Sequence, residues 1–138
     1  MERTGDITPY IPQRPPFVMV DELLFDGAAI TRTTFVVKAD NIFLQHGRLE
    51  AAALVENIAQ TAAAGAGYKA VLHQEAVKVG FIGAIKGLKV FALPALGDTL
   101  VTETKLVNTV FNVSIVEGVV KRGDEVLATC EMKIFLQP

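Results

Sequence analysis

The sequence predicts an α+β fold in which a curved antiparallel sheet wraps around one long central helix. Three observations support it: two strand-like segments come first, one long alanine-rich segment follows, and the remainder is rich in β-branched residues. With 138 residues, of which 51% are hydrophobic, the chain is long enough for one good core and too short for two. We therefore expect a single domain over residues 1–138.

The first two segments predict a β-hairpin. FVMVDELLFDG and AAITRTTFVV are dominated by β-branched and aromatic residues, and the turn-prone pair Asp26-Gly27 lies between them.

The alanine-rich segment predicts a helix from about Leu49 to Tyr68 or slightly beyond. Its length, its lack of proline and its many Ala and Leu residues favour a helix over a strand. Gly65 and Gly67 are expected to weaken the last turn. Because this helix is apolar on nearly all sides, it must be covered all round, and a sheet wrapped around it in the hot-dog architecture does so economically.

The remainder predicts three or four long antiparallel strands within VKVGFIGAIKGLKVF, DTLVTETKLVN and residues 110–138. Turns are expected at Leu96-Gly97-Asp98, near Asn108 and at Arg122-Gly123-Asp124. Such a sheet leaves an edge strand and part of the helix uncovered, so we expect two copies to pair as a homodimer.

Composition excludes several classes of function. A formal charge of −2 without a basic stripe argues against nucleic acid. Polar residues interrupt the longest apolar run, which argues against a membrane span, and the N-terminal residues do not resemble a secretion signal. The single cysteine, Cys130, predicts a buried thiol, and a soluble cytoplasmic protein is expected. The sequence has no ligand cluster and no phosphate loop, so neither metal nor organic cofactor is implied.

Glu56 and Gln60 are the first candidate site residues. They lie one helical turn apart on one face, and a slot is expected beside them because alanines flank them at positions 52, 53, 63 and 64. Apolar walls favour the neutral form of a carboxyl group, which would suit Glu56 to act as a general acid. The alternative is that Glu56, Asn57 and Gln60 form a narrow solvated stripe.

His46 is the second candidate, in the loop before the helix and followed by Gly47. Histidine is well suited to remove a proton near neutral pH. If the helix starts near Leu49, Glu56 lies about 10 Å along its axis, so a dimer would have to supply the partner across its interface. The alternative is that His46 is simply a surface residue, as we expect of His73.

The helix start is the third element. Free backbone N–H groups around Leu49 to Ala52 and the positive end of the helix dipole can polarise a thioester carbonyl, which acidifies the α-proton. Every helix has such an end, so only its coincidence with His46 and Glu56 makes it a candidate.

Three motifs, IPQRPPFVMVDELL, LVENIAQ and FIGAIKGLKVFALPALGD, resemble the hot-dog 3-hydroxyacyl-acyl-carrier-protein dehydratases, and the resemblance covers nearly the whole chain. IPQRPPFVMVDELL resembles that family's Leu-Pro-His-Arg-Tyr-Pro-Phe-Leu-Leu-Val-Asp, although Gln13 replaces its histidine, which is not the catalytic one. LVENIAQ resembles Leu-Glu-Ala-Met-Ala-Gln, which aligns Glu56 with the catalytic acid and Gln60 with the glutamine after it. FIGAIKGLKVFALPALGD resembles the Phe-Ala-Gly-Ile strand and the Pro-Gly-Asp turn, through Phe81, Gly83, Gly97 and Asp98.

The resemblance implies loss of water from a 3-hydroxyacyl thioester, giving a trans-2-enoyl product in fatty-acid-like or polyene lipid biosynthesis. His46 would take the α-proton, Glu56 of the opposite subunit would protonate the leaving hydroxyl, and amides near Ala51 would hold the carbonyl oxygen. Gln60 would orient Glu56, and Gly83 would let the substrate approach the strand closely. The thioester would be carried by acyl carrier protein or coenzyme A.

One departure from the family keeps alternatives open. The segment LQHGRLEAAALVE lacks the family's Phe-Pro-Gly, so His46 lies only ten residues before Glu56. This contraction is similar to divergent dehydratase-like proteins of aryl-polyene type. It favours an alternative function as a non-catalytic acyl-thioester-binding subunit that pairs with an active dehydratase. Thioester hydrolysis is a third possibility, and the assembly could also be a hexamer or a heterodimer.

Overall fold

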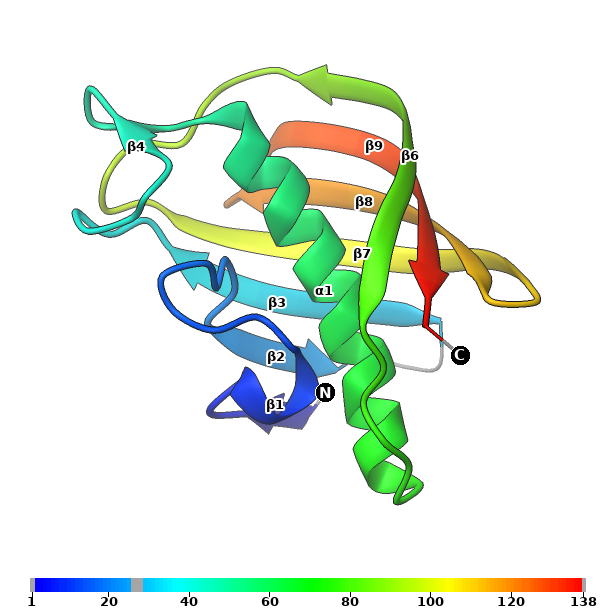
Figure 1. Ribbon diagram of the computed structural model, residues 1–138. Helices are drawn as coiled ribbons and strands as arrows, with labels where there is room; N and C mark the ends of the chain where they lie inside the picture. The colour runs from blue at the N-terminus through cyan, green and yellow to red at the C-terminus, as the bar shows by residue number, and fades with distance from the viewer. Residues whose placement is uncertain (1, 26–28, 138) are drawn as a thin grey trace.

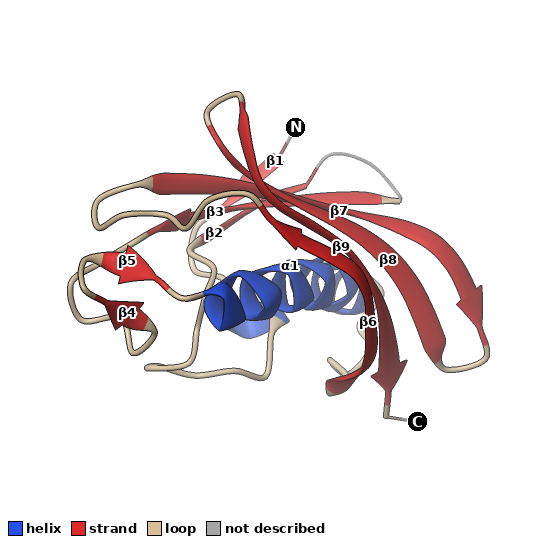
Figure 2. Ribbon diagram, turned by 90° about the horizontal axis from the view of Figure 1, so that it is seen from above, coloured by secondary structure: helices blue, strands red, loops and turns tan. Residues whose placement is uncertain are grey.

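The structure is a computed structural model that describes residues 2–25 and 29–137. Within these residues, seven strands form one antiparallel sheet in the order β1-β2-β3-β7-β8-β9-β6, and the helix α1 lies against its concave face (Figures 1 and 2). The strands of this sheet are β1 (Glu2–Thr4), β2 (Glu22–Phe25), β3 (Ile30–Val36), β6 (Gly80–Val90), β7 (Thr99–Val110), β8 (Val113–Arg122) and β9 (Glu125–Leu136). The other elements are the 3-10 turn η1 (Thr8–Tyr10), the short strands β4 (Leu44–Gln45) and β5 (Arg48–Leu49), and α1 (Ala51–Leu72). The predicted sheet around one long helix is confirmed.

The predicted first hairpin is present as β2 and β3, which pair antiparallel with Glu22 opposite Thr34. Its turn, Asp26-Gly27, lies outside the described residues. β2 begins later than predicted, because residues 17–19 do not extend the strand: the backbone of Met19 and the carbonyl of Phe17 bond to side chains of α1.

The helix runs to Leu72, so the prediction that Gly65 and Gly67 weaken its last turn is wrong. Both glycines lie inside the helix and are buried. A Cβ on Gly67 would stand 1.8 Å from the carbonyl oxygen of Tyr10, and one on Gly65 would stand 2.1 Å from the hydroxyl of Thr31. The glycines therefore allow the helix to approach η1 and β3 closely.

The later strands form a β7-β8-β9 meander, and β6 adds beside β9 as an edge strand. The predicted turn near Asn108 is wrong, because β7 continues to Val110 and the chain reverses at Phe111 and Asn112. At Asn108 there is instead a register shift against β8, which is typical of a β-bulge. The turns at Gly97 and Gly123 are confirmed, both with positive φ.

The core lies between α1 and the inner face of the sheet, where Leu54, Ile58 and Met132 are fully buried. The side of the helix that faces away from the sheet is only partly covered: Ala52 is exposed, and Val55 and Ala59 are half-buried. Part of the helix is therefore uncovered within one chain, as expected of such a sheet. The partly covered face carries Glu56.

The predicted buried thiol is confirmed. Cys130 is buried in β9, and desolvation by burial raises the pKa of its thiol. Among the described residues, no helix combines the length and hydropathy that a membrane crossing requires.

Candidate functional site

Glu56 lies in the second turn of α1, half-buried, and its side chain meets Gln60 as the spacing predicts. The Nε2 of Gln60 donates to Oε2 of Glu56 at 3.1 Å. The alternative of a solvated stripe is wrong for the two amides, because Asn57 and Gln60 are fully buried. The half-buried carboxyl group of Glu56 therefore lies beside the buried amide of Gln60, which donates a hydrogen bond to it.

Gln60 also fixes the segment that precedes β2. Its Oε1 accepts from the backbone N–H of Met19 at 2.7 Å, and its Nε2 donates to the carbonyl of Phe17 at 2.9 Å. One side chain thus links Glu56 to residues 17–19, and the orientation of the carboxylate depends on that segment.

Gln60 and Asn57 together clamp residues 17–19 to the helix, and the part of Asn57 was not predicted from the sequence. Its Nδ2 donates to the carbonyl of Met19 at 2.7 Å, and its Oδ1 accepts from the hydroxyl of Thr102 in β7. The only sequence signal was an amide in a largely apolar helix. A buried amide is costly unless it is hydrogen-bonded, so such a residue requires partners. Asn57 therefore ties the helix, the sheet and residues 17–19 together.

His46 lies at the tip of the small β4-β5 hairpin and is exposed. His46 and Gly47 are the two residues between the paired Gln45 and Arg48, with φ of 52° and 76°. Positive φ at both positions is the geometry of a type I′ turn, which explains the glycine. In the described part of the chain, no hydrogen bond joins His46 to Glu56, and neither residue lines the cavity described below.

The hairpin that carries His46 is fastened to the loop between β6 and β7. The N–H of Leu96 donates to the carbonyl of Gly47 at 3.0 Å, and the N–H of Leu49 donates to the carbonyl of Pro94 at 2.8 Å. Asp98 anchors the loop: its Oδ2 accepts from Arg122 at 2.7 Å and from the N–H of Ala95 at 2.8 Å. These bonds, that from Arg122 first, hold the pKa of Asp98 below its ordinary value of 3.8.

Replacing Asp98 by asparagine is therefore expected to destabilise the protein in a pH-dependent way. A depressed folded-state pKa contributes stability above the unfolded value, and this contribution is lost as pH falls through the folded pKa. At pH 7 the variant should lose about 0.5–1 kcal/mol of unfolding free energy, because the pair with Arg122 is partly exposed to solvent, which screens it. The loss should shrink as pH falls below 3.8. Urea unfolding at several pH values measures this loss. The control is Asp124→Asn in the exposed β8-β9 turn, which should show no pH-dependent loss. A loss that is the same at all pH values would contradict the prediction.

The helix begins at Ala51, and the prediction of free N–H groups from Leu49 onward is wrong for Leu49 and Glu50, whose N–H groups donate to the carbonyls of Pro94 and Phe43. Glu50 is the N-cap residue, its side chain makes no capping hydrogen bond, and the half-buried Ala51 begins the helix. The N–H groups of the first turn are therefore not capped by that side chain.

Gly83 lies in the edge strand β6, at a register shift against β9. A Cβ there would stand 1.9 Å from the ring of Phe135, so the space beside this glycine is filled by an aromatic ring of its own chain. This packing accounts for the glycine, and its role toward a substrate stays a prediction.

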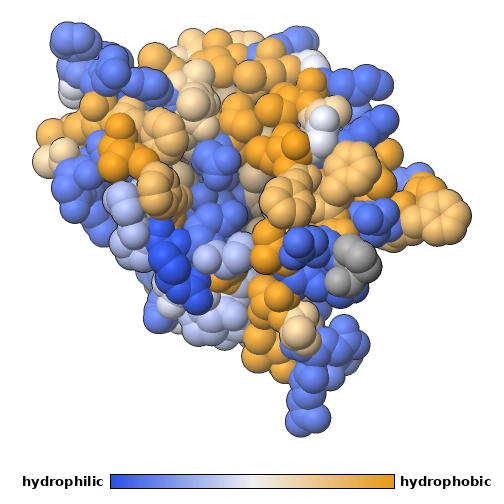
Figure 3. All heavy atoms as spheres, in the orientation of Figure 1, coloured by the Kyte–Doolittle hydropathy of each residue, from blue (hydrophilic) through white to orange (hydrophobic). Residues whose placement is uncertain are grey.

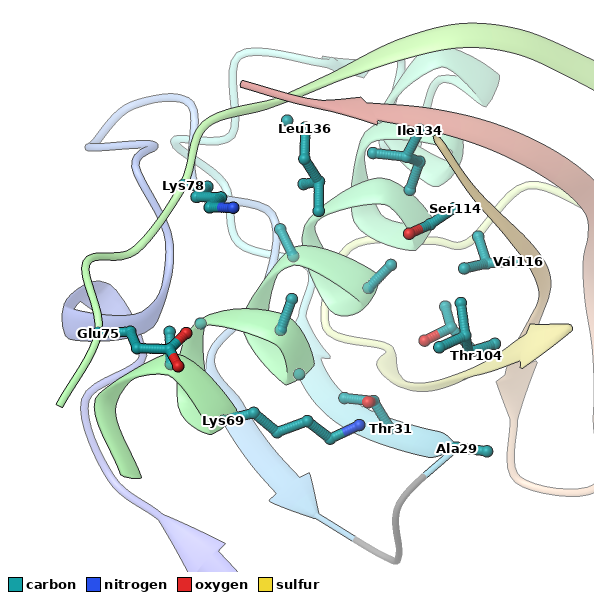
Figure 4. A pocket seen from close by; sticks show the side chains of 18 of the residues that line it. Ala29, Thr31, Lys69, Glu75, Lys78, Thr104, Ser114, Val116, Ile134 and Leu136 are labelled. Atoms are coloured by element: carbon teal, nitrogen blue, oxygen red, sulfur yellow. The ribbon is translucent and has the colours of Figure 1, made fainter. Parts of the chain in front are cut away.

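A cavity of about 330 Å³ lies between the second half of α1 and the inner face of the sheet (Figure 4). Its helix wall runs from Ala62 to Ala70 and, apart from Lys69, is made of small residues, and its sheet wall includes Val116, Ile134 and Leu136. Of the alanines expected to flank a slot, only Ala63 lines it, and Glu56 does not. The cavity begins at Ala62, six residues beyond Glu56, or about 9 Å along the helix. The sequence could not locate it, because six elements build it, namely α1, β3, β6, β7, β8 and β9.

The edge strand β6 is apolar and uncovered. Figure 3, in the orientation of Figure 1, shows apolar side chains gathered over this strand. Its exposed large apolar residues are Phe81, Ile82, Ile85, Leu88 and Val90. An exposed, long, apolar edge strand with free backbone groups is a template for pairing with another chain.

One long helix held inside a curved antiparallel sheet defines this chain as a hot-dog fold protein. The sequence matches the ApeP-like family, described as ApeP dehydratase, over residues 5–138. The chain therefore belongs to the ApeP-like dehydratase family.

Solved structures agree on the fold. The dehydratase heterocomplex ApeI:P from Xenorhabdus doucetiae contains a chain that is similar with a TM-score of 0.91 and 18% identity, covering 98% of this chain and 93% of that one. The uncharacterized protein PH1136 from Pyrococcus horikoshii gives a TM-score of 0.70 at 13% identity, covering 99% and 95%. A hypothetical thioesterase from Streptococcus pneumoniae, solved with coenzyme A, gives 0.66 at 9% identity, covering 83% and 84%. None of the curated proteins compared with the chain matches it in sequence.

Proposed function

We propose that the protein removes water from a 3-hydroxyacyl thioester to give the trans-2-enoyl thioester. The observation that carries this proposal is Glu56, a carboxyl group on a partly covered helix face, held by the buried Gln60 in a chain of a dehydratase family. The thioester is carried by acyl carrier protein or coenzyme A, in fatty-acid-like or polyene lipid biosynthesis.

The reaction needs one base, one acid and a group that stabilises the carbonyl oxygen. His46 takes the proton from C2, the C2–C3 double bond forms, and the C3–O bond breaks as Glu56 protonates the leaving hydroxyl, which departs as water. The N–H groups near Ala51 hold the carbonyl oxygen, on which negative charge develops as the C2 proton leaves. Gln60 keeps the carboxyl group of Glu56 directed at the substrate.

His46 and Glu56 act from different subunits in this proposal. His46 is exposed at the tip of its hairpin, with no hydrogen bond to Glu56 within the described residues, and the uncovered β6 edge offers a surface for a second chain. A homodimer formed along β6 would bring the two residues together. A heterodimer with a related dehydratase would do so too, and the similar Xenorhabdus doucetiae chain comes from a heterocomplex; either pair could stack further into a hexamer.

One observation favours a second candidate function. The shortened hairpin leaves His46 exposed at its tip, where no other described part of the chain buries it. A non-catalytic subunit that binds the acyl thioester and pairs with an active dehydratase would need no base at this position.

The test is hydration of a crotonyl thioester, the reverse reaction, by the purified full-length chain. Loss of the enoyl absorbance without release of thiol would support the dehydratase. Binding of the thioester without turnover would support the non-catalytic subunit, and release of free thiol would indicate a thioesterase. Adding a related active dehydratase to the inactive chain would then show whether pairing restores turnover beyond that of the added enzyme.

A further inference from the structure

An apolar row crosses the outer face of the sheet at the end where the β7-β8 turn lies. Four neighbouring strands contribute one residue each, and these residues are partners in the strand register: Val110 of β7, Val113 of β8, Phe135 of β9 and Phe81 of β6. Residues opposite each other in register point to the same face of a sheet. That face is the outer one, because the preceding residue of β9, Ile134, points into the core.

Phe111 extends this row at the turn itself. It is 97% exposed, and its φ of 55° is a left-handed conformation that glycine adopts with less strain. The β7-β8 hairpin that carries it projects beyond the neighbouring ends of β3 and β9 (Figure 1). Local folding therefore does not account for a phenylalanine here, since the position combines backbone strain with exposed apolar surface.

The outer patch, defined as Phe81, Val110, Phe111, Val113 and Phe135, is large enough for a protein interface. At roughly 200 Å² for a phenylalanine, its three phenylalanines alone leave about 400 Å² exposed. Contiguous apolar patches of this size mark interaction sites. When two chains use the same patch, these residues bury about 800 Å², which is about half of a standard interface and matches its apolar share.

The side chains around the outer patch carry both signs of charge. The nearest charged row contains Lys105, Glu117, Glu131 and Lys86 in strand order, and Lys133 lies between this row and the patch. A surface that binds anionic lipid would instead be bordered by basic residues. A mixed border suits a protein partner of nearly balanced charge, and this chain has a net charge of only −2.

The shape of the outer patch also favours a particular partner. It is a row across four strands, which fits another sheet, because sheets pack face to face about 10 Å apart with their strands nearly aligned. A second copy of this chain brings such a sheet with the same apolar row and the same mixed border. One two-fold axis then covers the patch of both chains.

We propose that the outer patch binds the outer patch of a second copy of this chain, sheet against sheet, about a two-fold axis. This contact uses the face of the sheet and leaves the backbone edge of β6 free for pairing. It is therefore separate from the dimer along β6 and does not rest on the proposed function. Together with pairing along β6, it joins dimers into a larger assembly.

Sedimentation equilibrium of the full-length protein over a range of concentrations tests this contact. Two variants remove apolar surface and suit the local backbone: glycine in Phe111→Gly adopts positive φ, and threonine in Val110→Thr stays β-branched. We expect the dissociation constant of this contact to rise about 30-fold in Phe111→Gly, as for an aromatic hot spot. The rise should be about fourfold in Val110→Thr, which loses one methyl group.

The matched control is Val101→Thr, which makes the same change on the same face of β7, near its other end, where the valine is 36% exposed. It should keep the wild-type dissociation constant. A wild type that stays monomeric at all concentrations would overturn the inference. So would a wild-type assembly that is equally stable in Phe111→Gly, because that result would assign the association to another surface such as β6.

A lipid surface is the other occupant that the experiment tests. Vesicles of phosphatidylcholine and phosphatidylglycerol in equal parts are sedimented with the wild type and with Phe111→Gly. Vesicle binding that is lost in the variant, in a chain that does not self-associate, would assign the outer patch to lipid and overturn the inference. Self-association that weakens in Phe111→Gly and Val110→Thr but not in Val101→Thr supports it.

Discussion

Replacing Glu56 by glutamine is expected to lower the rate of crotonyl-thioester hydration by about 10²–10⁴-fold, the usual contribution of a positioned acid or base. Glutamine keeps the size of the side chain and still offers an oxygen to Nε2 of Gln60, so the fold should be unaffected. The effect should therefore appear in kcat and not in the unfolding midpoint. Initial rates over a range of thioester concentrations, beside urea unfolding, measure both.

The control for this change is Glu117→Gln, which removes the same charge from the exposed outer face of β8 and should keep the wild-type rate. His46→Ala belongs in the same series. A large loss in both site variants supports a dehydratase with its base in the shortened hairpin. Full activity of Glu56→Gln would remove Glu56 from the reaction.

Replacing Asn57 by alanine is expected to cost about 2–4 kcal/mol of unfolding free energy. The change leaves the buried carbonyl of Met19 and the buried hydroxyl of Thr102 without a partner, at about 1–3 kcal/mol for each. It also frees one end of the clamp on residues 17–19. Urea unfolding measures the loss from the midpoint at an unchanged slope.

Asn108→Ala is the matched control, because within residues 2–25 and 29–137 the exposed side chain of Asn108 bonds only to the N–H of its neighbour Thr109. Its loss should stay within about 0.5 kcal/mol, as at most surface positions. A loss below about 1 kcal/mol for Asn57→Ala would show that residues 17–19 are held mainly by Gln60 and by packing.

Much of the fold could be predicted from local patterns, and the errors have identifiable physical causes. The hairpin and the helix are evident from composition because their patterns extend over many residues. Gly65 and Gly67 were misread because their low helix propensity is outweighed by close contacts with Thr31 and Tyr10, which are distant in sequence. Asn108 looks like a turn residue, but it lies at a bulge within a strand pair, which no local pattern separates from a turn.

The candidate site could be predicted only in part. Glu56 and Gln60 were found because helical spacing alone places them together. The role of Asn57 was missed because its partners, Met19 and Thr102, come from segments far apart in the sequence. The joint action of His46 and Glu56 stays a prediction, since it requires a second chain.

The fastening of the His46 hairpin links two functions that lie apart in the sequence. β6 ends at Val90, and only a few residues later the chain bonds to the hairpin through Pro94 and Leu96. The segment that leaves the edge strand therefore also holds the hairpin that carries His46. If the proposed dimer forms along β6, pairing there and the position of His46 are connected through this short segment.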